Sequence, residues 1–315
     1  MSEIWLTYNG KVLERNGKIL LRPETMDIPP MTLRFRFKDK TFVPNNTTNA
    51  KVGRWYVVDA SNGIYDWTYN NSDWSGAFYF SSYSASEKYL PECDIIGSGD
   101  ISIVTNASYM FRHAPGGPLI DSAIIDFHNG VTNIKSIFHT TPIKNVALYG
   151  TSSITDASYA FEDTSIRSAY IEDASSVTNM KYMFYKCSGI TSGSSIVVNN
   201  TSNVTDMSYM FSHCVNLESA PTLDTQNVIN MDRMFQYCHL KHVPLLDTRS
   251  AESMSGTFFY NQIVESGALA LYQQASSQAN PPTYHGNCFN LCGNSTVTGA
   301  AELAQIPADW GGTMS

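Results

Sequence analysis

The sequence predicts an α/β repeat solenoid in which each repeat of 23–27 residues supplies one short helix and one strand. The first observation is a set of seven eight-residue blocks that align without gaps and all end in Phe. The second is a pair of alternating positions, mostly apolar, upstream of six of these blocks. The blocks span residues 104–111, 131–138, 154–161, 177–184, 204–211, 228–235 and 251–258. Their final Phe residues are 27, 23, 23, 27, 24 and 23 positions apart.

The block has the pattern of a short helix. Its third position is always Asn, Asp or Ser, the residue types that cap free N–H groups at a helix start. Its fourth, seventh and eighth positions are mostly apolar, as in Met207, Met210 and Phe211, and this spacing gives one buried helical stripe. Core packing explains the Met and Phe residues better than a cofactor or peptide groove. A degenerate block at 71–78 keeps the final Phe and is expected to form an N-terminal cap.

The segment upstream of each block has the pattern of a strand. Position −8 from the block holds Ala123, Val146, Ala169, Ile196, Ala220 and Val243. Position −6 holds Ile125, Leu148, Ile171, Val198, Thr222 and Leu245. Alternate inward positions are typical of a strand, and a strand plus a short helix per repeat is a leucine-rich-repeat-like plan with a parallel sheet. Pro221 and Pro244 should interrupt the sheet towards the C-terminus, because proline cannot donate a ladder hydrogen bond.

The intervening positions then form an outward row, which is the candidate binding face. Its chosen members are Asp126, Tyr149, Tyr170, Glu172, Asn199, Leu223 and Leu246. The C-terminal third of this row is apolar, which is unusual for a surface that meets only water. Either a partner or neighbouring subunit binds there, or flanking segments of the chain cover it.

Four regions follow from these patterns. Residues 1–28 form a β-hairpin arm with Asn-Gly turns at 9–10 and 16–17. Because a short hairpin is marginal alone, the arm should dock on the rest of the chain or anchor it in an assembly. Residues 29–95 form a β-rich N-terminal cap, residues 96–262 the solenoid and residues 263–315 a helical C-terminal cap. Helices are expected over 264–278 and 298–306.

The sequence offers little support for catalysis, nucleic-acid binding or membrane insertion. A net charge of −8 with 15% charged residues gives no basic surface for phosphates. No apolar stretch is long enough to span a bilayer, and the N-terminus lacks the pattern of a secretory signal, so we expect synthesis without export. No catalytic or cofactor motif occurs, and the six cysteines lack metal-site spacing. We expect buried thiols, although cysteines in adjacent repeats could come within reach of each other.

The blocks Val-Thr-Asn-Met-Lys-Tyr-Met-Phe at 177–184 and Val-Thr-Asp-Met-Ser-Tyr-Met-Phe at 204–211, with Leu217 and the run Leu-Asp-Thr at 223–225, resemble the BspA-type repeat of bacterial surface proteins. The resemblance covers roughly residues 100–260. It implies an adhesin, a class that carries secretion signals, whereas no such signal is recognisable here. This alternative would place the protein on a bacterial cell surface.

The N-terminal hairpin pattern, the Arg-Phe-Arg-Phe strand at 34–37 and the C-terminal residues 267–274 and 298–310 resemble repeat proteins of phages and prophages of gut Bacteroides, including crAss-like phages. This likeness implies a non-enzymatic virion protein, either a tail appendage or a head decoration, and a location in the virion. It also implies an oligomer within the particle, other virion proteins as partners of the N-terminal arm, and a host-surface glycan or protein as a target.

Overall fold

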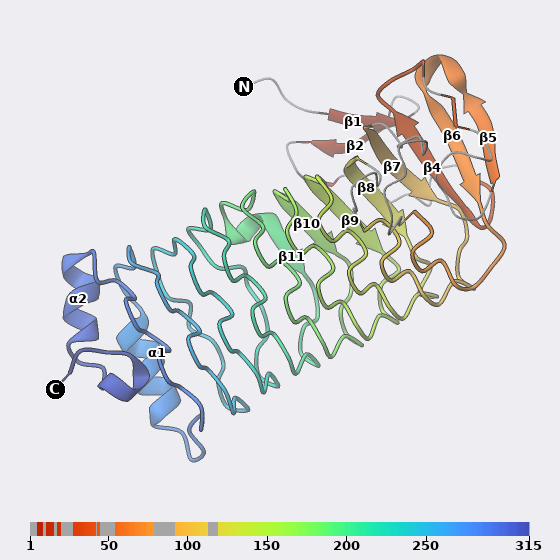
Figure 1. Ribbon diagram of the computed structural model, residues 1–315. Coiled ribbons are helices and arrows are strands. Elements are labelled where there is room, and N and C mark those ends of the chain that lie inside the picture. Colours follow the sequence, from red (N-terminus) through yellow and green to blue (C-terminus); the bar gives the residue numbers. More distant parts are fainter. Residues whose placement is uncertain are drawn as a thin grey trace, which may run out of the picture. The chain divides into compact units, whose positions relative to one another are not determined.

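The structure, a computed structural model, describes residues 5–8, 11–15, 18–19, 28–41, 43–44, 54–78, 92–112 and 119–314. The chain divides into two compact units. The first comprises residues 1–154 and 164–174, and the second comprises residues 155–163 and 175–315. Both are built from stacked turns of a solenoid, which confirms the repeat fold predicted from the sequence (Figure 1).

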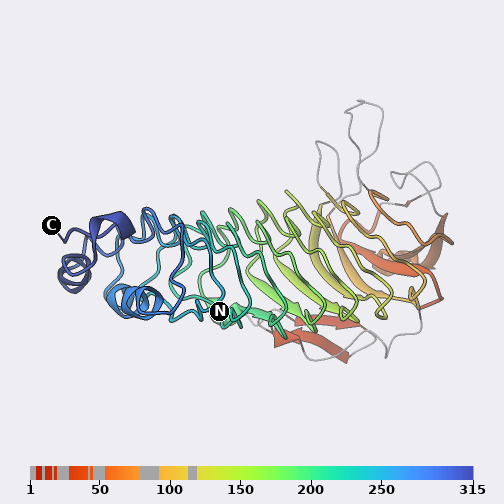
Figure 2. The same ribbon diagram turned by 90° about the horizontal axis from the view of Figure 1, so that it is seen from below.

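The first unit contains a mixed sheet in which parallel solenoid strands continue into antiparallel ones (Figure 2). Its strand order is β10-β9-β8-β7-β4-β6-β5. Strands β7 to β10 pair in parallel, whereas β4 pairs antiparallel with both β6 and β7. The bounds are β4 Thr32–Phe37, β5 Arg54–Asp59, β6 Ile64–Thr68, β7 Cys93–Ser98, β8 Ile120–Asp126, β9 Asn145–Tyr149 and β10 Ser168–Ile171.

The N-terminal arm forms a separate antiparallel sheet in the order β1-β2-β3. Its strands are β1 (Trp5–Tyr8), β2 (Lys11–Arg15) and β3 (Lys18–Ile19), and Tyr8 pairs with Lys11. This confirms the hairpin pattern, while the Asn-Gly turns at 9–10 and 16–17 lie outside the described residues.

Strand β4 shows why the β-rich N-terminal region is stable. Phe35 and Phe37 alternate with Arg34 and Arg36, so one face of the strand is apolar and the other is charged. Phe35 is fully buried and lies 5.3 Å from Phe78, measured between ring centroids. On the other face, the guanidinium of Arg34 forms a bidentate pair with Asp66 of β6, at 2.7 and 2.8 Å, which satisfies two buried charges together.

The second unit consists mostly of turns. It has one short strand, β11 (Ile196–Val198), and two C-terminal helices, α1 (Ala268–Ser276) and α2 (Val297–Leu303), among its described residues (Figure 1). Helix α1 lies within the expected range 264–278, and α2 begins one residue before the expected range 298–306; both are shorter than expected, with Gly267 as the N-cap of α1 and Thr296 as the N-cap of α2. No strand follows Pro221 among the described residues, which agrees with the predicted interruption of the sheet by Pro221 and Pro244.

The eight-residue block is a series of turns and not the short helix that we expected. Main-chain N–H groups bond to the next turn of the solenoid: Met180 donates to Asp206 O at 2.9 Å, Tyr182 to Ser208 O at 3.0 Å and Phe184 to Met210 O at 2.9 Å. Tyr182 adopts φ +58°, a left-handed conformation that interrupts a right-handed helix. The polar third position still caps the block, because its side chain accepts the N–H group two residues on, as Asp206 does from Ser208 at 2.8 Å.

The core is a stack of phenylalanine rings. All seven block Phe residues are fully buried, as predicted. In the second unit the rings of Phe161, Phe184, Phe211, Phe235 and Phe258 stack nearly in parallel at 5.2–5.6 Å between centroids. In the first unit Phe78 stacks on Phe111 at 5.2 Å, so the degenerate block at 71–78 forms a true turn.

The stack also extends further than the sequence pattern indicated, because Phe289 follows Phe258 at 5.9 Å.

The predicted alternation of strand residues holds in β10 and β11 but not throughout. Inward positions are buried and intervening ones are partly or fully exposed in both strands. In β8, residues 122–126 are all buried, so both strand faces are covered. After Pro244 the phase shifts by one residue: Leu245, expected inside, is 70% exposed, and Leu246, expected outside, is 7% exposed.

Candidate binding surfaces

The candidate face predicted from the strand pattern divides between the two units. Asp126, Tyr149, Tyr170 and Glu172 lie in the first unit, and Asn199, Leu223 and Leu246 lie in the second. Asp126, Tyr149 and Leu246 are buried, whereas the other four residues are half-buried. That these residues bind a partner stays a prediction.

In the first unit the predicted face forms a small aromatic and acidic cluster. The rings of Tyr149 and Tyr170 lie 5.5 Å apart across neighbouring strands β9 and β10. The carboxylates contribute to the turns that follow the strands. Asp126 accepts the N–H of His128 at 2.8 Å, and Glu172 accepts the N–H of Gly150 at 2.8 Å. The buried carboxylate of Asp126 thus accepts a main-chain hydrogen bond within the turn that follows β8.

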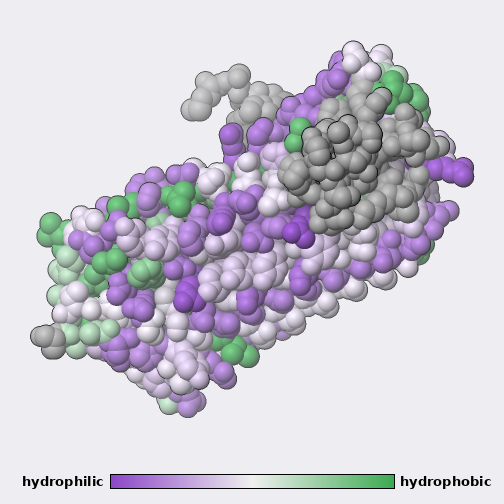
Figure 3. All heavy atoms as spheres, viewed as in Figure 1, coloured by the Kyte–Doolittle hydropathy of each residue, from purple (hydrophilic) through white to green (hydrophobic). Residues whose placement is uncertain are grey.

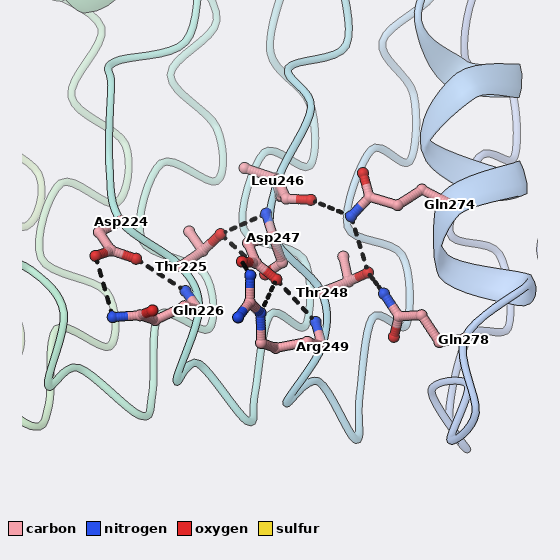
Figure 4. Close-up of polar contacts among 9 residues, drawn as sticks. All are labelled: Asp224, Thr225, Gln226, Leu246, Asp247, Thr248, Arg249, Gln274 and Gln278. Atoms are coloured by element: carbon pink, nitrogen blue, oxygen red, sulfur yellow. Dashed lines mark hydrogen bonds and ion pairs between the residues drawn. The ribbon is translucent and has the colours of Figure 1, made fainter.

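In the second unit the C-terminal helix covers part of the predicted face. The side-chain amide of Gln274 in α1 donates to the carbonyl oxygen of Leu246 at 2.8 Å (Figure 4). Leu246 is buried, and α1 contacts its main chain. This contact favours cover by a flanking segment of the chain at Leu246, while binding of a partner to the face stays a prediction.

A threonine in several turns links that turn to the next (Figure 4). Thr225 Oγ1 accepts the N–H of Asp247 at 2.8 Å and donates to its carbonyl oxygen at 3.0 Å. Thr201 makes the same two bonds to Asp224. At Thr248 the side-chain amide of Gln278 donates to Oγ1 at 2.5 Å. At this threonine, Gln274 of α1 and Gln278 just beyond the helix thus take the place of the next turn's main chain.

A second surface, which the sequence interpretation missed, lies along the sixth position of the blocks. Tyr159, Tyr182 and Tyr209 occupy this position in successive turns of the second unit and are half-buried. Their rings are almost parallel, at 4.9 and 4.4 Å between centroids. Burial and the neighbouring tyrosines raise the pKa of Tyr182. The phenol of Tyr182 therefore stays protonated near neutral pH.

Another set of rings follows each buried Phe by one or two residues. Tyr185 contacts His213 at 5.3 Å, His213 contacts Tyr237 at 4.8 Å, and Tyr237 contacts Tyr260 at 4.8 Å. Tyr185 also packs edge-on against Tyr182 at 5.1 Å, so the two sets are continuous. We call the combined surface the aromatic stripe; it comprises Tyr159, Tyr182, Tyr185, Tyr209, His213, Tyr237, Phe259 and Tyr260.

Three cations lie against the aromatic stripe. Lys181 Nζ is 5.5 Å from the ring centre of Tyr182, Lys186 Nζ is 5.3 Å from that of Tyr185, and Arg233 Cζ is 5.3 Å from that of Tyr209. Arg233 also donates to the hydroxyl of Tyr209 at 2.5 Å. The signal in the sequence was the recurrence of Tyr at the sixth block position, to which the expected helix gives no role.

The cysteines are buried free thiols. In three successive turns the thiol donates to the carbonyl oxygen of the Phe one turn earlier: Cys187 to Phe161 at 2.9 Å, Cys214 to Phe184 at 3.1 Å and Cys238 to Phe211 at 3.1 Å. Burial raises the pKa of Cys214 and Cys238. The described residues contain no group of three or more His, Cys, Asp or Glu side chains placed to hold a metal ion.

Within the described ranges, no helix is long and apolar enough to cross a membrane.

Comparison with known proteins gives one match. Residues 168–268 match the model of a family described as "Mycoplasma protein of unknown function, DUF285". No curated protein and no solved structure matched significantly. The matched segment contains four of the Phe-ended blocks and β11. The match and the solenoid turns together support a BspA-like repeat family for this part of the chain.

Proposed function

We propose that this protein is a non-enzymatic binding protein of a bacteriophage virion, either a tail appendage or a head decoration, that presents its repeat surface to a protein or to the host surface. The observation that supports a binding role most is that different parts of a turn hold the stack together and face outward. The main chain and the Phe ring contact neighbouring turns, while in the second unit the sixth and tenth block positions carry rows of exposed or half-buried side chains, namely Tyr159, Tyr182 and Tyr209 at the sixth and Lys186, His213, Tyr237 and Tyr260 at the tenth. Such extended rows are the usual binding surfaces of repeat proteins.

A non-enzymatic role fits the chemistry of the described residues. The thiols are buried and protonated, and the carboxylates of Asp126 and Glu172 accept main-chain hydrogen bonds in turns. A nucleophile needs an adjacent base and access to substrate. Neither group offers both.

The virion location is supported by the likeness of the N-terminal and C-terminal sequences to phage repeat proteins. The arm β1–β3 is the segment that we assign to anchoring on other virion proteins, because a three-stranded sheet of this size gains stability by docking. We expect the protein to be an oligomer in the assembled particle.

The second candidate function is a bacterial cell-surface adhesin of BspA type. It is favoured by the matched family, whose description names Mycoplasma, a cellular bacterium. Both candidates use the solenoid for binding, and they differ in where the protein resides.

Mass spectrometry of purified virions separates the two. For a virion protein we expect the chain at a constant ratio to the major capsid protein through a density gradient, and loss of incorporation when residues 1–28 are deleted. For an adhesin, the chain is absent from virions and an antibody against it labels intact bacteria. A chain found in neither location contradicts both candidates.

A further inference from the structure

We propose that the aromatic stripe of the second unit binds an anionic polysaccharide, a carbohydrate chain that carries carboxylate or sulfate groups. The inference rests on the proposed binding role but not on the virion location. It names a ligand class for a surface that lies apart from the predicted strand face.

The stripe's unpaired cations provide the first support. The second unit contains five Lys and Arg residues in all, namely Lys181, Lys186, Arg233, Lys241 and Arg249. Lys241 pairs with Glu218 at 2.6 Å and Arg249 pairs with Asp247 at 2.6 Å. The other three make no ion pair among the described residues, and all three lie over rings of the aromatic stripe. The cations of the second unit that make no ion pair therefore all lie on one surface, in a chain of net charge −8.

The stacking of the tyrosines determines which ring surfaces a ligand can reach. The rings of Tyr159, Tyr182 and Tyr209 cover one another at 4.4–4.9 Å, and Arg233 lies over the free side of Tyr209. Stacking of neutral sugars or of nucleobases needs an open ring face, which the rings of Tyr182 and Tyr209 do not offer. The edges and hydroxyl groups of these two rings remain, and both carry partial positive charge that favours an anion.

Main-chain hydrogen bonding disfavours a peptide that binds as an added strand. The N–H groups of Tyr182, Tyr209 and Arg233 donate to the next turn at 2.8–3.0 Å. A peptide could therefore contact only side chains here and would gain none of the main-chain bonds that strand addition supplies. A polysaccharide is recognised by side chains alone, through its acidic groups and hydroxyls.

The spacing suits a linear polymer. Successive turns are separated by about 4.8 Å, so Lys181 and Arg233, two turns apart, lie roughly 10 Å apart along the stack. Glu162 and Asp163 belong to the first turn of the stripe, so the anionic groups of the ligand should meet the later turns, from Lys181 to Arg233. Asp232 lies beside Arg233, and its carboxylate accepts the N–H of Ser255 at 2.9 Å.

Binding of the full chain to dextran sulfate, polygalacturonate and uncharged dextran, measured by affinity electrophoresis at low and at physiological salt, tests the proposal. We expect retardation by the two charged polysaccharides and none by dextran. The triple variant Lys181→Gln, Lys186→Gln, Arg233→Gln should weaken binding by at least about tenfold. Added salt should reduce the difference in affinity between this variant and the unmodified chain.

The matched control is the double variant Lys241→Gln, Arg249→Gln, which removes cations from the same unit away from the stripe. It should bind within about twofold of the unmodified chain, because its cations are already paired. Circular dichroism and thermal melts establish that each variant is folded. Equal losses in the triple and double variants would overturn the proposal, as would equal retardation by dextran or equally tight binding of poly-glutamate or single-stranded DNA.

This test does not depend on the virion location, and its failure can be distinguished from failure of the proposed binding role. If the folded chain binds host cells or virion partners but not the charged polysaccharides, the stripe proposal fails and the binding role stands.

Discussion

The ring of Phe211 lies against that of Phe184 at 5.3 Å between centroids, and the two ring planes differ by only 9°. On its other side Phe211 meets Phe235 at 5.5 Å. Phe211 therefore contacts the turn before its own and the turn after it, so the loss of this ring removes contacts from three turns together.

Replacement of Phe211 by alanine should cost about 3–5 kcal/mol of unfolding free energy, because the ring is fully buried and its removal leaves a cavity. Urea denaturation followed by circular dichroism measures the loss. Phe211→Leu, which refills most of the space, should cost less. An unchanged denaturation midpoint for the alanine variant would contradict the stacked core.

Loss of the two capping glutamines should destabilise the C-terminal end. In the double variant Gln274→Ala, Gln278→Ala, Leu246 O loses the amide donor of Gln274 in α1 and Thr248 Oγ1 loses that of Gln278 beyond the helix, at a cost of about 1–3 kcal/mol. Hydrogen exchange should accelerate first in residues 243–278. Gln273→Ala, an exposed position on the same helix, serves as the control and should exchange like the unmodified chain.

The thiols should not react in the folded protein. Burial raises the pKa of Cys93, Cys214 and Cys238, and so depletes the reactive thiolate. A disulfide reagent should label none of the six cysteines until denaturant is added. The variant Gln273→Cys places one thiol on the exposed face of α1 and should label at once. Rapid labelling of the unmodified chain would show that its thiols are accessible.

Stability should fall on acidification in a way that depends on His213. Burial lowers the pKa of His213, and Lys186 lowers it further. The unfolded chain therefore takes up this proton at a higher pH than the folded chain, so the contribution of His213 to stability declines as pH falls below about 6.5. His213→Asn, which suits the left-handed φ of +62°, should show a smaller drop in melting temperature between pH 7.5 and 5. An identical drop in both proteins would contradict this prediction.

The stacked core could be predicted from the sequence because its cause is a repeated identity at a nearly fixed spacing. Phe at the eighth block position can face inward only if every turn has a similar path, so periodicity alone placed all seven rings. The polar third position was also informative, since a carboxylate or amide such as that of Asp206 accepts a nearby N–H in a turn or in a helix.

The conformation of the block could not be predicted in the same way. The backbone adopts φ between +52° and +58° at Tyr182, Tyr209 and Arg233. Gly and Asn adopt this left-handed conformation more readily than Tyr or Arg. The hydrogen bonds to the next turn outweigh this local preference. The expected helix accounts for the third, fourth, seventh and eighth positions of the block and gives the sixth position no role, so the aromatic stripe was not predicted. The shift at Leu245 and Leu246 has a similar origin, since Pro244 breaks the period-two pattern.

The hydrogen bonds from Tyr182 N to Ser208 O and from Tyr209 N to Asp232 O have an evolutionary consequence. They involve peptide groups, which every residue type except proline supplies in full. Side chains at the sixth and tenth block positions can thus be exchanged while the turns stay joined. Selection can therefore change which ligand the outer surface recognises, one turn at a time, while the fold stays the same.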